Sequence, residues 1–363
     1  MPAWDENIAT LRAFAMMHVL VVHSLFWPVH PELYSDASIF RALFLFEMPL
    51  FFFLTGACNK SGKRGILNFY FSRFQRIVPA YLVYCLLGAA LTFATGKGLR
   101  QGFSDIFYLF SVFPPPGAPV THLPYLTRAL WFVPVYLSIV LILPLLQRIH
   151  HSCRQPYACI PFVGCALILF ALVFFSFPGN PRTGNILSYV IFYSFWAYLG
   201  FYYDRLDLRA AVKTKIKVIP LIIVCFSITG VFVYGNKNFS DMQANKFPPN
   251  FVFLAYSLGV MGLLYLFYST LHRFLAFCRC LPAFAWIFTQ YSTHTYTIFL
   301  YHPLCFLAIK FLSEWLALWD KLCAHPFLCI SVHAVLAIPL GAILGRFLSW
   351  PERIKFFPVI GKS

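Results

Sequence analysis

The sequence predicts an all-α integral membrane protein of about ten transmembrane helices, with both termini in the cytoplasm. Of its 363 residues, 60% are hydrophobic and only 11% are charged. A soluble domain is usually about a quarter charged. The apolar residues also recur in stretches of about 20, the length that spans a bilayer. Most of them must therefore face lipid or other helices, and a soluble globular protein is excluded.

Ten stretches have the length and composition of a spanning helix. They are 8–27, 40–58, 77–95, 129–147, 157–177, 186–203, 218–235, 251–271, 290–311 and 326–345. Region 96–128 is not among them, because its apolar part, 103–113, is too short to span. It runs into Pro114-Pro115-Pro116-Gly117, so an outer loop with a re-entrant or interfacial piece is expected.

The charge distribution gives the orientation. A net charge of +16 would suit a nucleic-acid partner, but Lys and Arg cluster in alternate short loops, as the positive-inside rule predicts. This pattern places both termini in the cytoplasm and favours a bilayer over nucleic acid. The first stretch follows Asp5 and Glu6 without a small-residue cleavage site, so we expect an uncleaved helix.

The rest of the composition indicates a single domain over residues 1–363. The sequence has no internal repeat, no low-complexity tract and no loop long enough to fold alone. Its 11 Cys residues are scattered singly, so they predict neither a disulfide framework nor a metal site.

The first predicted helix carries Arg12 and His23 on one face. Eleven residues at about 100° each return to within about 20° of the same direction, about 16 Å along the axis. A cation near the cytoplasmic end and an imidazole deeper in the bilayer suit an anionic cofactor at one depth and proton chemistry at another. The alternative is a snorkelling Arg and a packing His.

Glu47 is the carboxylate that we place inside a spanning stretch. The second helix runs from outside to inside, so Glu47 is expected at a depth similar to that of His23. A neighbouring carboxylate would fix the tautomer of the imidazole and raise its basicity. A neutral buried Glu, or one wetted at the interface, is the alternative.

Arg73 and Arg76 precede the third predicted helix. The spacing R-x-x-R puts two guanidinium groups on one helical face at the membrane surface, which suits phosphate groups. Ordinary positive-inside charge is the alternative.

The motif Tyr301-His302-Pro303 lies in the predicted helix 290–311. Pro303 introduces a kink and frees a backbone carbonyl, and His302 lies deep enough to join a central polar site. The segment 245–250, Asn-Lys-Phe-Pro-Pro-Asn, is predicted on the outer face, where it would shape an acceptor entrance or serve only as a loop.

Taken in order, these features resemble the acyltransferase 3 family of bacterial membrane O-acyltransferases, in particular its fucose 4-O-acetylase-like branch. The matching segments are Arg12-x10-His23, 48–56 (MPLFFFLTG), Arg73-x-x-Arg76 before 79–81 (PAY), 130–134 (LWFVP), 195–200 (FWAYLG), 245–249 and 301–303. Thr55 stands where the family usually has Ser, which keeps the hydroxyl. The extra extracytoplasmic domain of some members is absent from this sequence.

The resemblance implies a ten-helix enzyme of the bacterial inner membrane. Such an enzyme would take an acetyl group from cytoplasmic acetyl-CoA, without a metal, and pass it to a sugar hydroxyl of a surface polysaccharide or its lipid-linked precursor. His23 would then be catalytic, supported by Arg12 and Glu47, and Arg73 and Arg76 would bind the phosphates. Further residues expected to line the site are Thr55, Trp131, Tyr301 and His302. His23 would either deprotonate the acceptor hydroxyl or carry the acetyl group.

A carrier or flippase for lipid-linked saccharides is the main alternative function. Such proteins often show inverted repeats or broken-helix pairs, and neither is found. A polysaccharide ligase or polymerase would be expected to carry a large, charge-rich outer loop, whereas 96–128 is apolar and proline-rich.

Overall fold

The computed structural model describes residues 5–26, 45–59, 65–94, 131–152, 183–235, 242–247, 249–318, 321 and 324–354. These residues are mostly helical, and among them the only β-type pairing is an isolated bridge between Lys246 and Pro249. The all-α membrane fold is thus confirmed. The predicted span 157–177 and the region 103–113 lie outside the described residues, so the count of ten and the cytoplasmic termini stay predictions.

Seven helical segments in the described part of the chain are long and apolar enough to cross a membrane. They are α1 (Glu6–Phe26), α4 (Ile66–Thr92), α7 (Phe132–Ser152), the run from α10 (Val212–Lys215) through η5 (Ile216–Val218) into α11 (Ile219–Gly235), α13 (Phe251–Cys278), α15 (Thr295–Trp315) and α17 (Pro326–Leu348). Each overlaps a predicted span.

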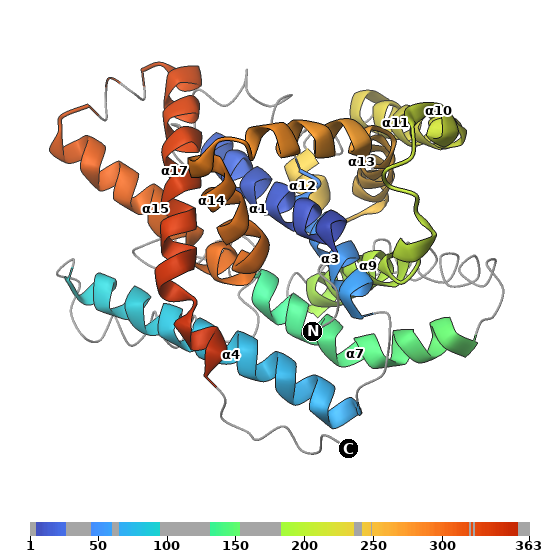
Figure 1. Cartoon of the computed structure of the whole chain (residues 1–363), viewed down its shortest axis with the longest axis horizontal. Coiled ribbons are helices and arrows are strands. Elements are labelled where there is room, and N and C mark those ends of the chain that lie inside the picture. The colour runs from blue at the N-terminus through green and yellow to red at the C-terminus, as the bar shows by residue number, and fades with distance from the viewer. Residues whose placement is uncertain are drawn as a thin grey trace. The chain divides into compact units, whose positions relative to one another are not determined.

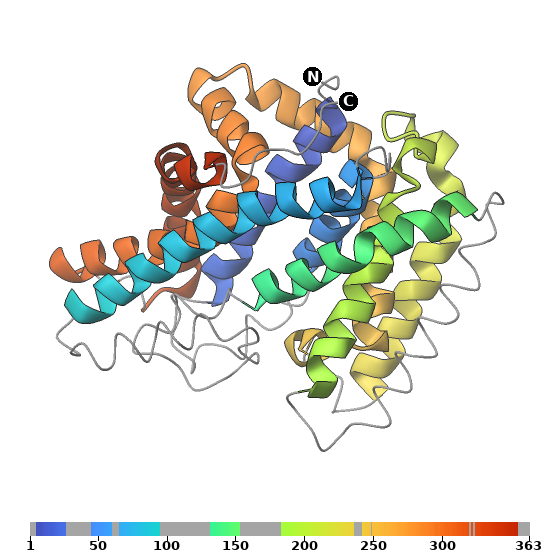
Figure 2. The same ribbon diagram turned by 90° about the horizontal axis from the view of Figure 1, so that it is seen from below.

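The chain divides into two compact units, each built from three sequence segments. Unit 1 draws on Met1–Ala15, Asp36–Gly62 and Ile142–Trp286, and unit 2 on Met16–Ser35, Lys63–Leu141 and Ile287–Ser363. In unit 1, α3 (Glu47–Asn59) packs on α9 (Thr183–Gly200), and α11 runs beside α13 (Figure 1 and Figure 2).

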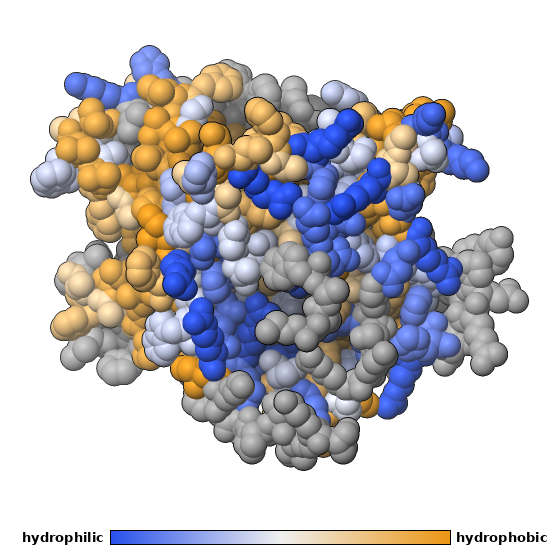
Figure 3. Space-filling model, in the orientation of Figure 1, coloured by the Kyte–Doolittle hydropathy of each residue, from blue (hydrophilic) through white to orange (hydrophobic). Residues whose placement is uncertain are grey.

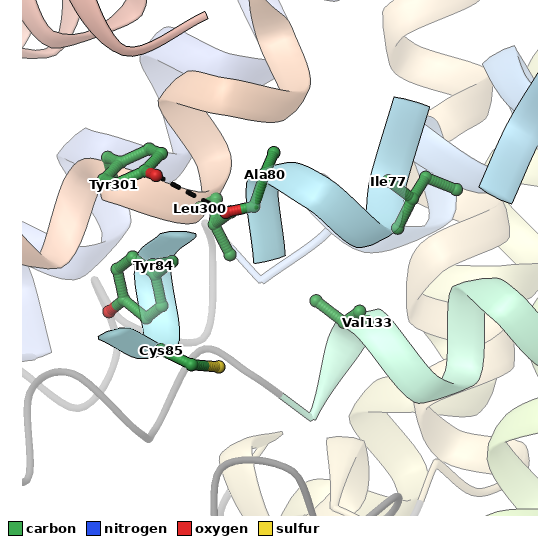
Figure 4. Packing of buried hydrophobic residues seen from close by; sticks show 7 residues of the cluster. All are labelled: Ile77, Ala80, Tyr84, Cys85, Val133, Leu300 and Tyr301. Carbon is green, nitrogen blue, oxygen red and sulfur yellow. Dashed lines mark hydrogen bonds between the residues drawn. The ribbon is translucent and has the colours of Figure 1, made fainter. Parts of the chain in front are cut away.

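In unit 2, α15 packs along α17, and α4 contacts both α15 and the short helix η7 (Trp350–Arg353). A buried apolar cluster fills the space between α4, the start of α7 and α15 (Figure 4). Its members are Ile77, Ala80, Tyr84, Cys85, Val133, Leu300 and Tyr301.

Two differences from the predicted helix boundaries affect the candidate site. α4 begins at Ile66 rather than at 77, so Arg73 and Arg76 lie inside a helix and not in a loop. The prediction took the charges of Arg73 and Arg76 as the mark of a loop. Basic side chains have long apolar stems, however, and can lie on a helix at the membrane surface. The predicted helix 290–311 is also divided, because α14 (Pro282–Thr293) ends before His294 and α15 starts after it.

Large apolar side chains are exposed on α15 and α17. Figure 3 shows hydrophobic residues gathered over both helices. The exposed side chains are Phe311, Leu312, Trp315, Phe327, Leu328, Val335, Leu336, Ile343 and Phe347. Contiguous exposure on this scale would be costly in water. It is what a surface in contact with lipid requires, in line with the membrane assignment.

The acidic start of α1 has a structural explanation within unit 1. Glu6 pairs with Arg209 at 2.6 Å and with Arg279 at 3.0 Å. Asp5 accepts a hydrogen bond from the hydroxyl of Tyr203 at 3.0 Å. Burial is the main cause that raises the pKa of this phenol, and the negative charge of Asp5 is the second. These contacts tie the first turn of α1 to the rest of the unit.

The contact between α3 and α9 depends on two glycines. A Cβ on Gly56 would overlap the carbonyl oxygen of Ala197, and one on Gly200 would overlap that of Phe53. The two backbones can approach this closely because neither position has a side chain, as at other close helix crossings in membranes.

We predict that Gly56→Val forces α3 away from α9 and lowers the unfolding free energy by about 1–3 kcal/mol or more. Thermal unfolding of the purified protein in detergent measures this as a lower melting temperature. Gly230→Ala on α11 is the matched control, because no atom lies within 4 Å of a Cβ built there. Equal melting temperatures for the two variants would contradict the close packing.

Candidate active site

The missing amide N–H of Pro303 organises the middle of α15. Without it, the carbonyl of Phe299, four residues earlier, cannot receive its usual helical hydrogen bond. The ring Nδ1 of His302 lies 2.5 Å from this oxygen. A carbonyl oxygen can only accept a hydrogen bond, so Nδ1 carries the proton and Nε2 of the neutral ring carries the lone pair. The structure thus gives the carbonyl freed by Pro303 a partner and gives His302 one tautomer.

His23 lies beside His302 in unit 2. The centroids of the two rings are 4.7 Å apart and their planes are tilted by 44°. His302 is fully buried, whereas His23 is half-buried. The aromatic rings of Phe299 and Phe306 also pack against His302. The imidazole of His23 therefore contacts a buried polar ring while part of its own surface remains accessible.

Arg12 lies on the same uninterrupted helix, α1, as His23, as the spacing predicts. Its guanidinium group is half-buried and donates a hydrogen bond to the sulfur of Cys58 at 2.9 Å. Cys58 is near the end of α3, so this contact joins α1 to α3 within unit 1. A role of Arg12 in supporting His23 stays a prediction.

Glu47 is the first residue of α3 and is buried. The positive end of a helix dipole favours a carboxylate there. Its Oε1 forms an ion pair with Nζ of Lys246, which is equally buried at the end of α12 (Met242–Lys246). The ammonium group of Lys246 also lies 5.3 Å from the centroid of the Phe247 ring. Contact of Glu47 with His23 stays a prediction, because the two residues belong to different units.

The segment that carries Lys246 is folded into unit 1. Asn250 accepts a hydrogen bond from the backbone N–H of Phe253 at 3.1 Å and so caps α13. The side-chain amide of Asn250 donates to Oδ1 of Asn245 at 2.8 Å, and both residues are buried. From the sequence, this segment was expected to shape an acceptor entrance or to be only a loop. In the structure it supplies the cation that pairs with Glu47, and a role at an entrance stays a prediction.

Arg73 and Arg76 lie one turn apart on α4. The guanidinium of Arg73 lies 5.7 Å from the centroid of the Phe69 ring. Nε of Arg76 donates to Oε2 of Glu352 at 2.8 Å. Sequence reasoning did not single out Glu352, and the one available signal was a carboxylate within a mainly basic and apolar C-terminal segment.

Glu352 also holds the start of α15. Its Oε1 accepts hydrogen bonds from the backbone N–H of Thr297, at 3.1 Å, and from the hydroxyl of the same residue. One carboxylate thus joins Arg76 on α4, the first turn of α15 and its own helix η7. Arg76 is thereby held in a defined position, although 43% of its side chain remains exposed.

The remaining predicted residues occupy supporting positions. The hydroxyl of Tyr301 donates to the carbonyl of Ala80 at 3.4 Å, and its ring meets the ring of Tyr84 edge-on (Figure 4). Trp131 precedes α7 and packs edge-on against Phe132. Thr55 donates to the carbonyl of Phe51 within α3 at 2.9 Å. Among the described residues, no three His, Cys, Asp or Glu side chains are grouped as a metal site would require.

Comparison with known families identifies the protein class. The sequence model of the acyltransferase 3 family, described as an acyltransferase domain, matches residues 5–351. The chain belongs to the acyltransferase 3 family. The predicted family is thus confirmed, and the protein is a multi-pass membrane acyltransferase. Comparisons with the curated proteins and with the solved structures each give no significant match.

We predict that Lys246→Met destabilises the acyltransferase by about 3–5 kcal/mol, because it leaves the carboxylate of Glu47 buried without its cation. Glu47→Gln combined with Lys246→Met should recover much of this loss, since both charges are then removed. Thermal unfolding of the two single variants and the double variant forms the cycle. Strictly additive losses would show that the two side chains do not interact.

Proposed function

We propose that this acyltransferase moves an acetyl group from cytoplasmic acetyl-CoA to a sugar hydroxyl. The acceptor would be a surface polysaccharide or its lipid-linked precursor. The protein would lie in the bacterial inner membrane and belong to the fucose 4-O-acetylase-like branch of the family. The observation that carries the proposal is the contact between His23 and His302. A half-buried imidazole against a second imidazole of fixed tautomer suits proton transfer. A histidine that only fills space in the packing would not require a second imidazole beside it.

The reaction needs one base that later acts as an acid. In the direct route, His23 takes the proton of the acceptor hydroxyl while the oxygen attacks the thioester carbonyl. The C–S bond then breaks, and the departing CoA sulfur receives the proton from the imidazolium. In the alternative route, a ring nitrogen of His23 attacks the thioester carbonyl, the C–S bond breaks, and the departing CoA sulfur takes the proton that the ring gives up. The acceptor oxygen then attacks the acetyl group, the bond from the acetyl carbon to the ring nitrogen breaks, and the ring takes the proton of the hydroxyl. Both routes use the same imidazole and balance without a metal.

His302 acts in this proposal as a positioning residue. Because its Nδ1 is bonded to the carbonyl of Phe299, Nε2 is the ring nitrogen that can accept a proton from a neighbour. A hydrogen bond from one nitrogen of His23 to this Nε2 would leave the other nitrogen of His23 as the base. Pro303 would thereby influence the reactivity of His23 through His302.

The cationic residues serve the donor. Arg73 and Arg76 present two guanidinium groups one turn apart, which suits oxygens of the CoA phosphates. Arg12 would support the reaction near the cytoplasmic end of α1, and Glu47, Thr55, Trp131 and Tyr301 would complete or brace the site. A carrier for lipid-linked saccharides is the second candidate, and consumption of acetyl-CoA separates the two because a carrier leaves the thioester intact.

We predict that His23→Ala abolishes acetylation and leaves expression and membrane insertion unchanged, because the base or acetyl carrier is lost. Mass spectrometry of surface glycans from cells with wild-type or variant protein measures the acetyl group directly. His325→Ala is the matched control, since His325 is exposed in the same unit and should acetylate normally. Near-normal product from His23→Ala would remove the mechanism.

We predict that His302→Asn folds normally but acetylates at least about tenfold more slowly. The Asn amide can still donate to the carbonyl of Phe299, as Nδ1 does, but it has no counterpart of Nε2. His302→Phe should lower both stability and rate, since it also leaves that carbonyl without its donor. Melting temperatures show whether a variant is destabilised, and the pH profile of the acetylation rate shows whether the base has changed. Unchanged rate and pH profile in His302→Asn would show that His302 only packs.

A further inference from the structure

Unit 2 contains a group of cationic side chains around one carboxylate. Glu352 is engaged through both of its oxygens, one with Arg76 and the other with Thr297. The next residue, Arg353, is exposed, and so is Arg346 in the last turn of α17. One guanidinium group thus pairs with this carboxylate, and Arg346 and Arg353 add two exposed positive charges to the same unit.

His294 shows that these side chains share one local environment. It forms the break between α14 and α15, and a Cβ built on Gly345 would lie 3.5 Å from its own Cβ. The beginning of α15 therefore packs against the last turns of α17, next to Arg346. Burial lowers the pKa of His294, Glu352 opposes this shift, and the charges of Arg353, Arg346 and Arg76 add to it. All three guanidinium groups thus act on one imidazole.

Arg76 differs from Arg346 and Arg353 in how its side chain is held. Glu352 fixes the orientation of Arg76, whereas Arg346 and Arg353 project from the ends of α17 and η7 with exposed side chains. Exposed arginines held near one another on packed helices can form paired hydrogen bonds to phosphate oxygens. The two pairs, Arg73 with Arg76 and Arg346 with Arg353, lie on different helices of one unit, so they suit a ligand with two separate phosphate-bearing parts.

We propose that Arg346 and Arg353, beside His294, form a second phosphate subsite that binds the 3′-phosphate of the CoA donor, while Arg73 and Arg76 bind its diphosphate. This inference rests on the proposed function, because it takes the donor to be a CoA thioester. Coenzyme A carries its 3′-phosphate on the ribose, apart from the diphosphate that links ribose to pantetheine. The site would then distinguish CoA from 3′-dephospho-CoA.

Calorimetric titration of the full-length protein in nanodiscs of neutral lipid tests this without knowledge of the acceptor. We expect wild type to bind CoA at least about tenfold more tightly than 3′-dephospho-CoA, as the loss of charge-assisted hydrogen bonds implies. In Arg346→Gln/Arg353→Gln, the affinity for CoA should fall to that for 3′-dephospho-CoA, and their ratio should approach one. If the double variant unfolds, each single variant, Arg346→Gln or Arg353→Gln, should lower the ratio part of the way, and Arg346→Lys/Arg353→Lys, which keeps the charges but not the paired N–H groups, should lower it less.

Arg273→Gln/Lys217→Gln is the control, because it removes the same charge from exposed positions of unit 1 and should keep the wild-type ratio. A double variant of Arg346 and Arg353 that keeps the wild-type ratio, or a wild type that binds both ligands equally, would overturn the subsite. Equal binding of both ligands by wild type, together with weaker binding of the double variant to vesicles that contain anionic lipid, would assign the cluster to lipid headgroups instead. Absence of any CoA binding by wild type would count instead against the proposed donor.

Discussion

The absence of an N–H at Pro303 is the constraint on which the arrangement of the site depends. A spanning helix has no water in the bilayer core to satisfy a freed carbonyl, so the carbonyl of Phe299 needs a donor from within the protein. His302 provides it, and this bond fixes which of its nitrogens carries the proton. The ring of His23 then meets a partner of defined tautomer. A backbone defect in α15 thus prepares the contact from which the catalytic proposal is drawn.

Buried charge is handled by pairing in both units. In unit 1 the carboxylate of Glu47 meets the ammonium of Lys246, and both are buried. In unit 2 Glu352 meets Arg76, which stays partly exposed. The first pair suits a structural link, since a fully enclosed ion pair offers little to a ligand. The second suits positioning, because a guanidinium fixed at one edge can still bind an anion with its remaining N–H groups.

Local patterns in the sequence predicted what a single helix decides, and they missed what tertiary contacts decide. The apolar composition and the length of its stretch identified α1, and the spacing of Arg12 and His23 follows from one continuous helix. The carbonyl freed by Pro303 was also predictable. The pairing of Glu47 with Lys246 and of Arg76 with Glu352 joins residues far apart in the chain, so no spacing rule finds it. The start of α4 was missed because charge was taken as the mark of a loop.

An experimentally determined structure of the acyltransferase with a non-hydrolysable thioether analogue of acetyl-CoA tests the central claim most directly. The account predicts that the carbon in place of the thioester carbonyl lies about 3–4 Å from a ring nitrogen of His23, the distance that attack or proton transfer requires. The other face of the His23 ring should rest on His302. An analogue bound with its acyl end away from His23, or a His23 ring turned out into lipid, would contradict it.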